Sequence, residues 1–176
     1  MLFFLVSCTA KPQEKSSEAL ARAFEEAGLR VLKERIPSRD FSLPIASSGR
    51  AQSLSGFKGK VVFLNFWATW CGPCRAEMPS MNALYSKYRE KGLEIIAVNI
   101  MEKEADVIAF MENNKLSFPA YLDTDGAVSN SYGIQSIPSS FLIDREGKIV
   151  VRLVGSIDWD AHEIHAAIDQ LLNSVN

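Results

Sequence analysis

The chain has 176 residues, a formal net charge of −2 and only two histidines, with 47% hydrophobic and 23% charged residues. These values are typical of one globular domain with short appendages. They argue against a basic surface for nucleic acid and against a histidine-rich metal store. After the first residues, no apolar stretch is long enough to cross a bilayer.

The first eight residues carry a short apolar run that ends in a cysteine. Leu2 to Val6 is followed by Ser7 and Cys8. This resembles the bacterial lipobox, in which a small residue precedes a cysteine that is lipid-modified and becomes the new N-terminus. We interpret residues 1–8 as the remainder of a signal with Cys8 as the lipidation site. Because no basic residue precedes the run, we expect the true start to lie upstream or the sequence to be trimmed. The alternative is an apolar N-terminus whose cysteine has no role.

Residues 9–37 are expected to form a tether and an amphipathic helix. A polar stretch is followed by apolar residues at roughly helical spacing between Glu18 and Arg35, which predicts a helix over 18–35. Gly28 interrupts the pattern, and Pro37 is expected to stop the helix. This helix would cap the domain or hold it away from a membrane; the alternative is a helix that binds a partner.

Residues 38–176 alternate between strand and helix patterns. The run from Val61 to Ala68 is almost entirely apolar, as is typical of a central strand that is covered on both faces. Strand, helix and strand in this order predict a βαβ unit with a parallel pair. The expected elements are a loose β-hairpin within 40–59, a strand over 61–68, a helix that ends near Gly92, a strand over 93–100, a helix over 105–114, a strand over 118–122, a hairpin of strands 141–143 and 149–154, and a final amphipathic helix that includes Trp159.

Two cysteines lie between the first central strand and the helix that follows it. Cys71 and Cys74 are separated by Gly72 and Pro73. The thiolate is the form of cysteine that attacks disulfides, and a helix N-terminus stabilises negative charge. We therefore expect Cys71 to be the exposed nucleophile and Cys74, one turn into the helix, to be shielded and to close a disulfide with it. Pro73 suits the first turn of a helix, where its missing N–H leaves nothing unsatisfied.

Two other uses of the cysteine pair are possible in principle. A zinc knuckle needs a second pair of ligands, and only His162 and His165 are available. A structural disulfide across a two-residue loop removes little entropy from the unfolded chain. Both interpretations are disfavoured.

The motif and a downstream segment together resemble a known family. Residues 63–79, which contain the Trp70-Cys71-Gly72-Pro73-Cys74 motif, and residues 132–147, which contain Ile137-Pro138, are similar to the TlpA/ResA-like branch of the thioredoxin superfamily. The resemblance runs from about Asp40 to the C-terminus and does not cover residues 8–37. It implies an α/β, thioredoxin-like fold: a central mixed β-sheet flanked by helices, with an N-terminal β-hairpin and an αβ insert.

The resemblance also implies roles for single residues. Pro138 matches the cis-proline beside the active-site disulfide, which leaves the backbone of Ile137 free to pair with an extended substrate segment; the alternative is an ordinary turn proline. Trp70 and Pro73 would shape the contact surface. Glu77 matches a carboxylate that relays a proton to or from Cys74, although the same residue could equally be a solvated helix position.

The chain departs from thioredoxins proper at one position. Those proteins carry a buried aspartate where this sequence has Asn65, and an amide cannot exchange protons at neutral pH. Glu77 is then the remaining carboxylate for that task, which favours the extracytoplasmic branch over a general cytosolic thioredoxin.

The function that the resemblance implies is a disulfide reductase outside the cytoplasm, anchored to a membrane by the lipid on Cys8. It would receive electrons from a membrane thiol donor of the DsbD/CcdA kind and reduce client proteins such as apocytochrome c. The Gly72-Pro73 pair resembles that of reducing thioredoxins and favours a low potential. We expect a monomer whose redox centre is the Cys71–Cys74 disulfide, with no other cofactor, no metal and no nucleic-acid partner.

Two other functions compete with this interpretation. A peroxiredoxin-type peroxidase has a threonine three residues before its reactive cysteine and a proline further upstream, whereas here Thr69 lies two before Cys71 and Leu64 takes the place of the proline. A non-catalytic module would hold copper or a partner protein through Cys71 and Cys74. Copper sites of this kind usually add a methionine or histidine, and Met78, the nearest methionine, has a packing explanation.

Overall fold

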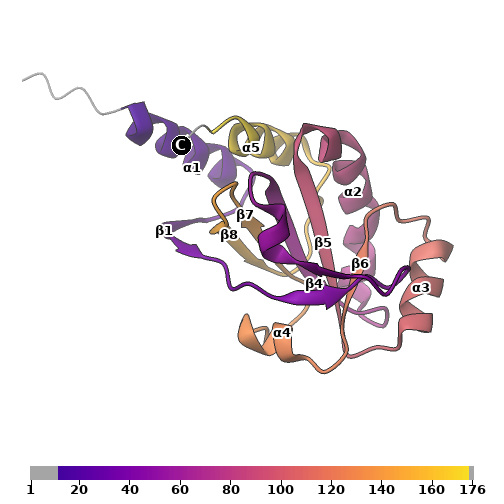
Figure 1. The fold of residues 1–176 in the computed structure, drawn as a ribbon. Coiled ribbons are helices and arrows are strands. Elements are labelled where there is room, and N and C mark those ends of the chain that lie inside the picture. Colours follow the sequence, from indigo (N-terminus) through magenta and orange to yellow (C-terminus); the bar gives the residue numbers. More distant parts are fainter. Residues whose placement is uncertain (1–11, 175–176) are drawn as a thin grey trace, which may run out of the picture.

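The computed structural model describes residues 12–174, and for residues 12–17 only the course of the backbone. Cys8 therefore lies outside the described residues. Figure 1 shows the elements, which are α1 (Pro12–Glu26), β1 (Val31–Pro37), β2 (Ser42–Pro44), β3 (Ala51–Ser53), β4 (Val61–Trp67), α2 (Gly72–Tyr88), β5 (Leu93–Ile100), α3 (Glu104–Asn113), β6 (Ala120–Asp123), α4 (Ala127–Ser131), β7 (Ser139–Ile143), β8 (Lys148–Val154) and α5 (His162–Asn173).

Within residues 12–174, six strands form one mixed sheet in the order β1-β8-β7-β4-β5-β6. β4, β5 and β6 run parallel to one another, while β7, β8 and β1 pair antiparallel. The predicted βαβ unit, αβ insert and C-terminal hairpin are confirmed. β2 and β3 pair separately as the expected antiparallel hairpin. The edges of the sheet are β1, whose register shifts between Val31 and Ile36, and β6, where Tyr121 bridges to Ile45.

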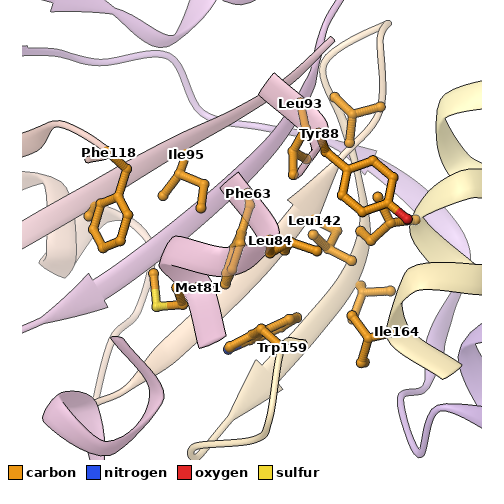
Figure 2. Packing of buried hydrophobic residues seen from close by; sticks show 14 of the residues in the cluster. Phe63, Met81, Leu84, Tyr88, Leu93, Ile95, Phe118, Leu142, Trp159 and Ile164 are labelled. Atoms are coloured by element: carbon orange, nitrogen blue, oxygen red, sulfur yellow. The ribbon is translucent and has the colours of Figure 1, made fainter. Parts of the chain in front are cut away.

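Both faces of β4 are buried, which explains its apolar sequence. Val61 and Phe63 point into the cluster that α1, α2 and α5 form over one face, and Val62 and Leu64 point into the smaller cluster on the other. Figure 2 shows the first cluster, in which Phe63 of the sheet meets side chains of α2 and of the C-terminal segment. β4 is thereby held as a rigid support for the residues that follow it.

The helix predicted over 18–35 is wrong in its second half. α1 ends at Glu26, and residues 31–37 form the edge strand β1 instead. Gly28 adopts a φ of +74°, and the N–H of Leu29 donates to the carbonyl of Phe24 at 2.7 Å. A glycine in this conformation ends a helix rather than merely interrupting it. The β-branched and apolar residues that follow, Val31 and Leu32, then join the sheet.

The structure differs from the predicted elements in two smaller ways, at Trp159 and at α4. Trp159 was expected in the final helix, but α5 begins at His162, so the indole lies in the loop between β8 and α5. The short helix α4 was not predicted, because five residues are too few to show a helical period.

Candidate active site

The cysteine pair lies where β4 ends and α2 begins, as predicted. Cys71 caps α2, and its sulfur accepts a hydrogen bond from the backbone N–H of Cys74 at 3.2 Å. The two residues form a disulfide with a Cα–Cα separation of 5.3 Å. The helix therefore presents its positive N-terminal end to the sulfur that the sequence marks as the nucleophile.

The exposure of Cys71 differs from the prediction. Only 5% of its surface is accessible, against 0% for Cys74. Its sulfur lies 3.8 Å from the carbonyl oxygen of Ile137, which approaches it from the loop before β7. In the disulfide form Cys71 is thus nearly covered, and it is only slightly more accessible than its partner.

The segment beside the disulfide is the one that the resemblance marked. The Ile137–Pro138 peptide bond is cis, and Pro138 is buried directly before β7. β7 pairs with β4 so that Ser139 lies opposite Phe66. This register brings residues 136–138 to the same end of the sheet as the cysteines. The cis bond and the approach of Ile137 to Cys71 contradict the alternative of an ordinary turn proline.

A groove of about 600 Å³ lies beside the site: neither cysteine lines it, but it is lined by Trp70, which precedes Cys71, and by Ile137, whose carbonyl oxygen approaches the Cys71 sulfur. Trp70 and Met101 stand at its rim with 71% and 67% of their surfaces exposed. Its walls come from four segments, and its lining residues are Trp70, Ile100, Met101, Ser129, Asn130, Ile134, Gln135, Ser136 and Ile137. All of them are uncharged. Pro73 is exposed on the first turn of α2 but does not line this groove.

Met101 was not singled out from the sequence. It directly follows β5, and ligands of α/β proteins gather at the carboxyl ends of parallel strands. That rule could have identified Met101 as a candidate site residue. Its use depends on knowing that β5 lies next to β4 in the same orientation.

Glu77 is buried, with 1% of its surface exposed, so the interpretation as a solvated helix position is wrong. It follows Cys74 by three residues on α2, which places the two side chains on neighbouring positions of one helix face. Its Oε1 accepts a hydrogen bond from Asn65 Nδ2 at 3.0 Å, and its Oε2 accepts one from Trp159 Nε1 at 3.0 Å. Burial raises the pKa of Glu77 to about 7, although the hydrogen bonds from Trp159 and Asn65 oppose the shift.

The neighbours of Glu77 come from distant parts of the chain. Asn65 Nδ2 also donates to Ser140 Oγ of β7 at 2.9 Å. Ser140 and Trp159 were not identified as site residues, since neither belongs to the motif. Asn65 was noticed for the absence of an aspartate, and the structure shows that its amide donates to the carboxylate.

A second carboxylate braces the turn before the cysteines. Glu102 Oε2 accepts hydrogen bonds from the backbone N–H of Thr69 at 2.7 Å and from Asn99 Nδ2 at 2.6 Å. Thr69 Oγ1 also donates to this carboxylate. Glu102 therefore ties the end of β5 to the residues that carry Trp70 and Cys71.

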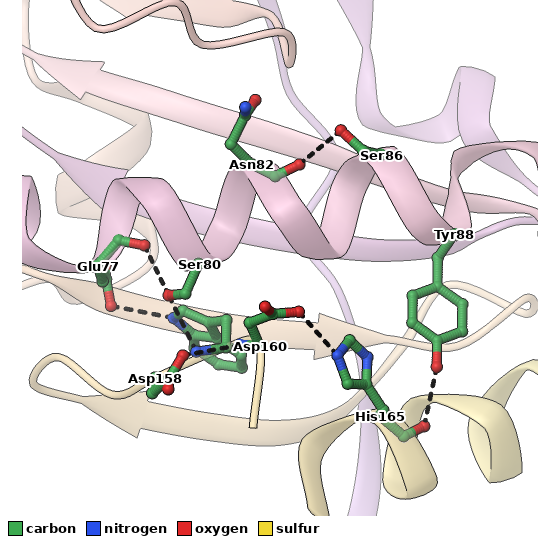
Figure 3. A network of polar contacts seen from close by, with 9 residues as sticks. Glu77, Ser80, Asn82, Ser86, Tyr88, Asp158, Asp160 and His165 are labelled. Atoms are coloured by element: carbon green, nitrogen blue, oxygen red, sulfur yellow. Dashed lines mark hydrogen bonds and ion pairs between the residues drawn. The ribbon is translucent and has the colours of Figure 1, made fainter. Parts of the chain in front are cut away.

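The histidines named in the zinc-knuckle alternative lie on α5. His165 Nε2 is 2.8 Å from Asp160 Oδ1, a local pair that Figure 3 shows. Among residues 18–174, whose side chains the structure describes, no three histidine, cysteine or acidic side chains gather closely enough to hold a metal ion. In the same part of the chain, no helix is both long and apolar enough to cross a membrane.

Comparison with known proteins supports this picture. Thiol-disulfide oxidoreductase ResA of Bacillus thuringiensis is 49% identical over 107 residues, which are 61% of this chain and 62% of the relative. The chain thus aligns with less than two thirds of that relative's length. ResA of Bacillus subtilis is 40% identical over 131 residues, or 74% of this chain and 73% of the relative.

Solved structures share the fold. StoA from Bacillus subtilis superposes with a TM-score of 0.62 and 27% identity over 79% of this chain and 98% of StoA. The thioredoxin domain of a thiol-disulfide oxidoreductase from Bacteroides vulgatus gives a TM-score of 0.69 and 28% identity over 81% and 99% of the two chains. The thioredoxin-like fold and the resemblance to the ResA-like branch are confirmed. The family model described as Redoxin matches residues 32–169, which hold the whole site, and the chain belongs to that family.

Proposed function

We propose that this protein is a thiol–disulfide oxidoreductase that reduces disulfides of extracytoplasmic client proteins. The observation that carries the proposal is the Cys71–Cys74 disulfide at the N-terminus of α2, next to the backbone of Ile137. Relatives named thiol-disulfide oxidoreductase ResA support it.

The proposed cycle is an exchange of disulfide bonds. In the reduced protein the Cys71 thiolate attacks a client disulfide, so that a Cys71–client bond forms, the client bond breaks and one client thiolate leaves. Cys74 then loses its proton and attacks the Cys71 sulfur, which closes the Cys71–Cys74 bond and releases the second client thiolate. Two electrons pass to the client. A membrane thiol donor of the DsbD/CcdA kind returns them.

The environments of the two cysteines fit this order of events. The N-terminus of α2 lies against Cys71, where a thiolate must form first. Cys74 is fully buried and far less suited to stable ionisation. Its proton needs an acceptor, and we assign that role to Glu77. With a pKa of about 7, this carboxylate is present in both protonation states near neutral pH.

The groove beside the disulfide is the proposed site for an extended client segment. Trp70 and Met101 offer exposed apolar surface on its rim, and Ile137 offers a backbone beside Cys71. Trp is frequently a strong contributor to protein contacts. Because the lining is uncharged, an apolar or neutral client segment suits it best. Pro73 would shape the approach to Cys71 from the helix side.

The cellular setting is part of the proposal. We infer that Cys8 carries the lipid that anchors the protein to a membrane on its extracytoplasmic side, and that apocytochrome c is a client. The lipobox-like residues 5–8 support the anchor. Mass spectrometry of the native N-terminus tests it: a diacylglyceryl cysteine is expected at Cys8, and an unmodified Cys8 contradicts it.

Trapping experiments test the redox function. Cys74→Ala should accumulate a mixed disulfide with client proteins through Cys71, while Cys71→Ala should trap almost none, because only Cys71 makes the first attack. Equilibration of the wild-type pair with a dithiothreitol series should give a potential of roughly −250 mV or lower. A value well above about −180 mV would contradict a reductase. Stoichiometric copper binding without thiol turnover would instead support the non-catalytic alternative.

A further inference from the structure

The loop between β8 and α5 places Trp159 directly against Glu77. The indole is fully buried, packs in a tilted arrangement against Phe63 with the ring centroids 4.2 Å apart, and donates from Nε1 to Glu77 Oε2 at 3.0 Å. Its backbone is held as well. The N–H of Trp159 donates to Ser80 Oγ at 3.0 Å, and Ser80 Oγ donates to the carbonyl of Glu77 at 2.9 Å. Figure 2 shows Phe63 and Trp159 beside each other in the core, and Figure 3 shows the hydrogen bonds of Glu77 and Ser80 on α2.

Two side chains from different elements donate to the two oxygens of Glu77, and a backbone hydrogen bond from Ile157 also favours the ionised carboxylate. Asn65 reaches Oε1 from the sheet, and Trp159 reaches Oε2 from the loop. At these atoms both residues are donors only, so neither can accept a proton from Glu77. Both hydrogen bonds favour the ionised carboxylate, whereas burial favours the neutral acid. The balance between these effects decides whether Glu77 can take a proton near neutral pH.

We propose that Trp159 is a positioning residue of the redox site, which fixes the Glu77 carboxylate and keeps it able to exchange a proton with Cys74. The inference rests on the function proposed above. It adds that a residue 82 positions from Glu77 in the sequence controls the proton step.

Few other groups near Glu77 could fix its carboxylate or change its protonation. Asn65 on β4 and Trp159 in the loop are neutral, and Cys74 on its own helix is held in the disulfide. Within residues 18–174, no charged side chain forms an ion pair or hydrogen bond with Glu77. The two charged residues that flank Trp159 in the loop, Asp158 and Asp160, are both exposed.

The chain provides a matched control in Trp67. This indole is also fully buried, packs on Phe110 at 5.2 Å between ring centroids, and has an Nε1 without a hydrogen-bond partner among the described residues. Trp67→Phe and Trp159→Phe therefore remove the same atoms from the same core. Only Trp159→Phe removes a donor from Glu77.

The experiment is an infrared titration of the oxidised protein. The carboxyl band of Glu77 is identified by its absence in Glu77→Gln. In Trp159→Phe we expect the midpoint of this band to rise by about one pH unit or more, since a hydrogen bond to a charged acceptor is lost. Trp67→Phe should titrate as the wild type. An unchanged midpoint in folded Trp159→Phe overturns the proposal.

A kinetic measurement connects the shift to the chemistry. The rate at which Cys74 resolves a mixed disulfide on Cys71 should fall about fivefold or more at pH 7 in Trp159→Phe and recover partly at higher pH. If Glu77→Gln resolves at the wild-type rate at every pH, the role of Glu77 in turnover fails, and with it the proton step assigned to Trp159. A wild-type protein that reduces no disulfide would instead contradict the proposed function, while the infrared result would still report on Trp159 and Glu77.

Should Trp159→Phe not fold, Ser80→Ala provides the second test. It leaves the indole in place but removes the hydroxyl that joins Trp159 to α2. A smaller rise in the same midpoint is expected. A wild-type midpoint in Ser80→Ala, with Trp159→Phe unfolded, overturns the proposal.

Discussion

Glu77 sits in the core one turn after Cys74, and its burial has a free-energy cost that depends on pH. Its pKa is about 7 in the fold and 4.5 as a free side chain. Between these values the folded protein binds more protons than the unfolded chain, so the free energy of unfolding falls as pH rises. The stability that the protein keeps while the buried Glu77 is protonated is fully present below pH 4.5 and is lost above about pH 7, where the buried side chain must ionise.

Glu77→Gln should remove this dependence. Glutamine resembles the protonated acid in shape and charge, so the wild type and the variant should be similarly stable near pH 4.5. The wild type should lose about 3 kcal/mol more than the variant between pH 4.5 and pH 7. Urea unfolding of both oxidised proteins across this range measures the difference. Parallel stability curves would show that Glu77 is already ionised at the acidic end.

Single residues of the site differ in how far the sequence could identify them. Cys71, Cys74 and Pro138 belong to local motifs whose chemistry depends on spacing along the chain. The burial of Glu77 could not be inferred in this way, because its partners Asn65 and Trp159 come from a strand and a loop. A helix position with a charge is compatible with solvent until the covering loop is known.

At the scale of elements, α1 is part of the core and not a loose tether. It packs on α5, and Phe24 is fully buried in the main cluster. The Redoxin match begins only at residue 32, so this helix is an addition to the family domain. The apolar spacing predicted its amphipathic face, but a glycine can weaken a helix or end it. Here the glycine ends the helix, because the residues that follow it pair as β1 with β8.

Phe24→Ala should therefore destabilise the whole domain. Truncation of a buried phenylalanine leaves a cavity and costs about 3–5 kcal/mol. Arg22→Ala, at an exposed position of the same helix, should change stability by less than about 0.5 kcal/mol. Denaturant unfolding of the two variants tests this. Equal stability would mean that α1 is detached from the domain in solution.

At the scale of the whole molecule, the sheet gathers the site from segments that are far apart in the sequence. The turn after β4, the end of β5, α4 and the loop before β7 all contribute to the groove. The mixed sheet that brings them together was expected from the family resemblance and is confirmed, whereas its strand order, β1-β8-β7-β4-β5-β6, comes from the structure. The groove itself was not predictable, since α4 and the conformation of Met101 leave no periodic pattern.

Trp70→Ala should weaken the binding of protein clients. The indole is the largest exposed apolar side chain on the rim, so KM for a disulfide-containing protein should rise about tenfold or more. The matched control is Ile36→Ala, which removes an exposed apolar side chain from β1, outside the groove. Reduction of insulin disulfides followed by turbidity provides the assay. Equal effects of the two substitutions would place client binding elsewhere.

The two edges of the sheet have a consequence for how these molecules tolerate crowding. On β1, Lys33, Glu34 and Arg35 follow one another, the register shifts and Pro37 ends the strand. On β6, the carbonyl of Ala120 accepts the N–H of Ala46 at 2.9 Å. The segment that follows β2 therefore already covers that edge. Charges, an irregular register and a covering segment all prevent a strand of another chain from adding to a sheet. Copies concentrated on one surface can therefore lie close together without their sheets joining into an aggregate.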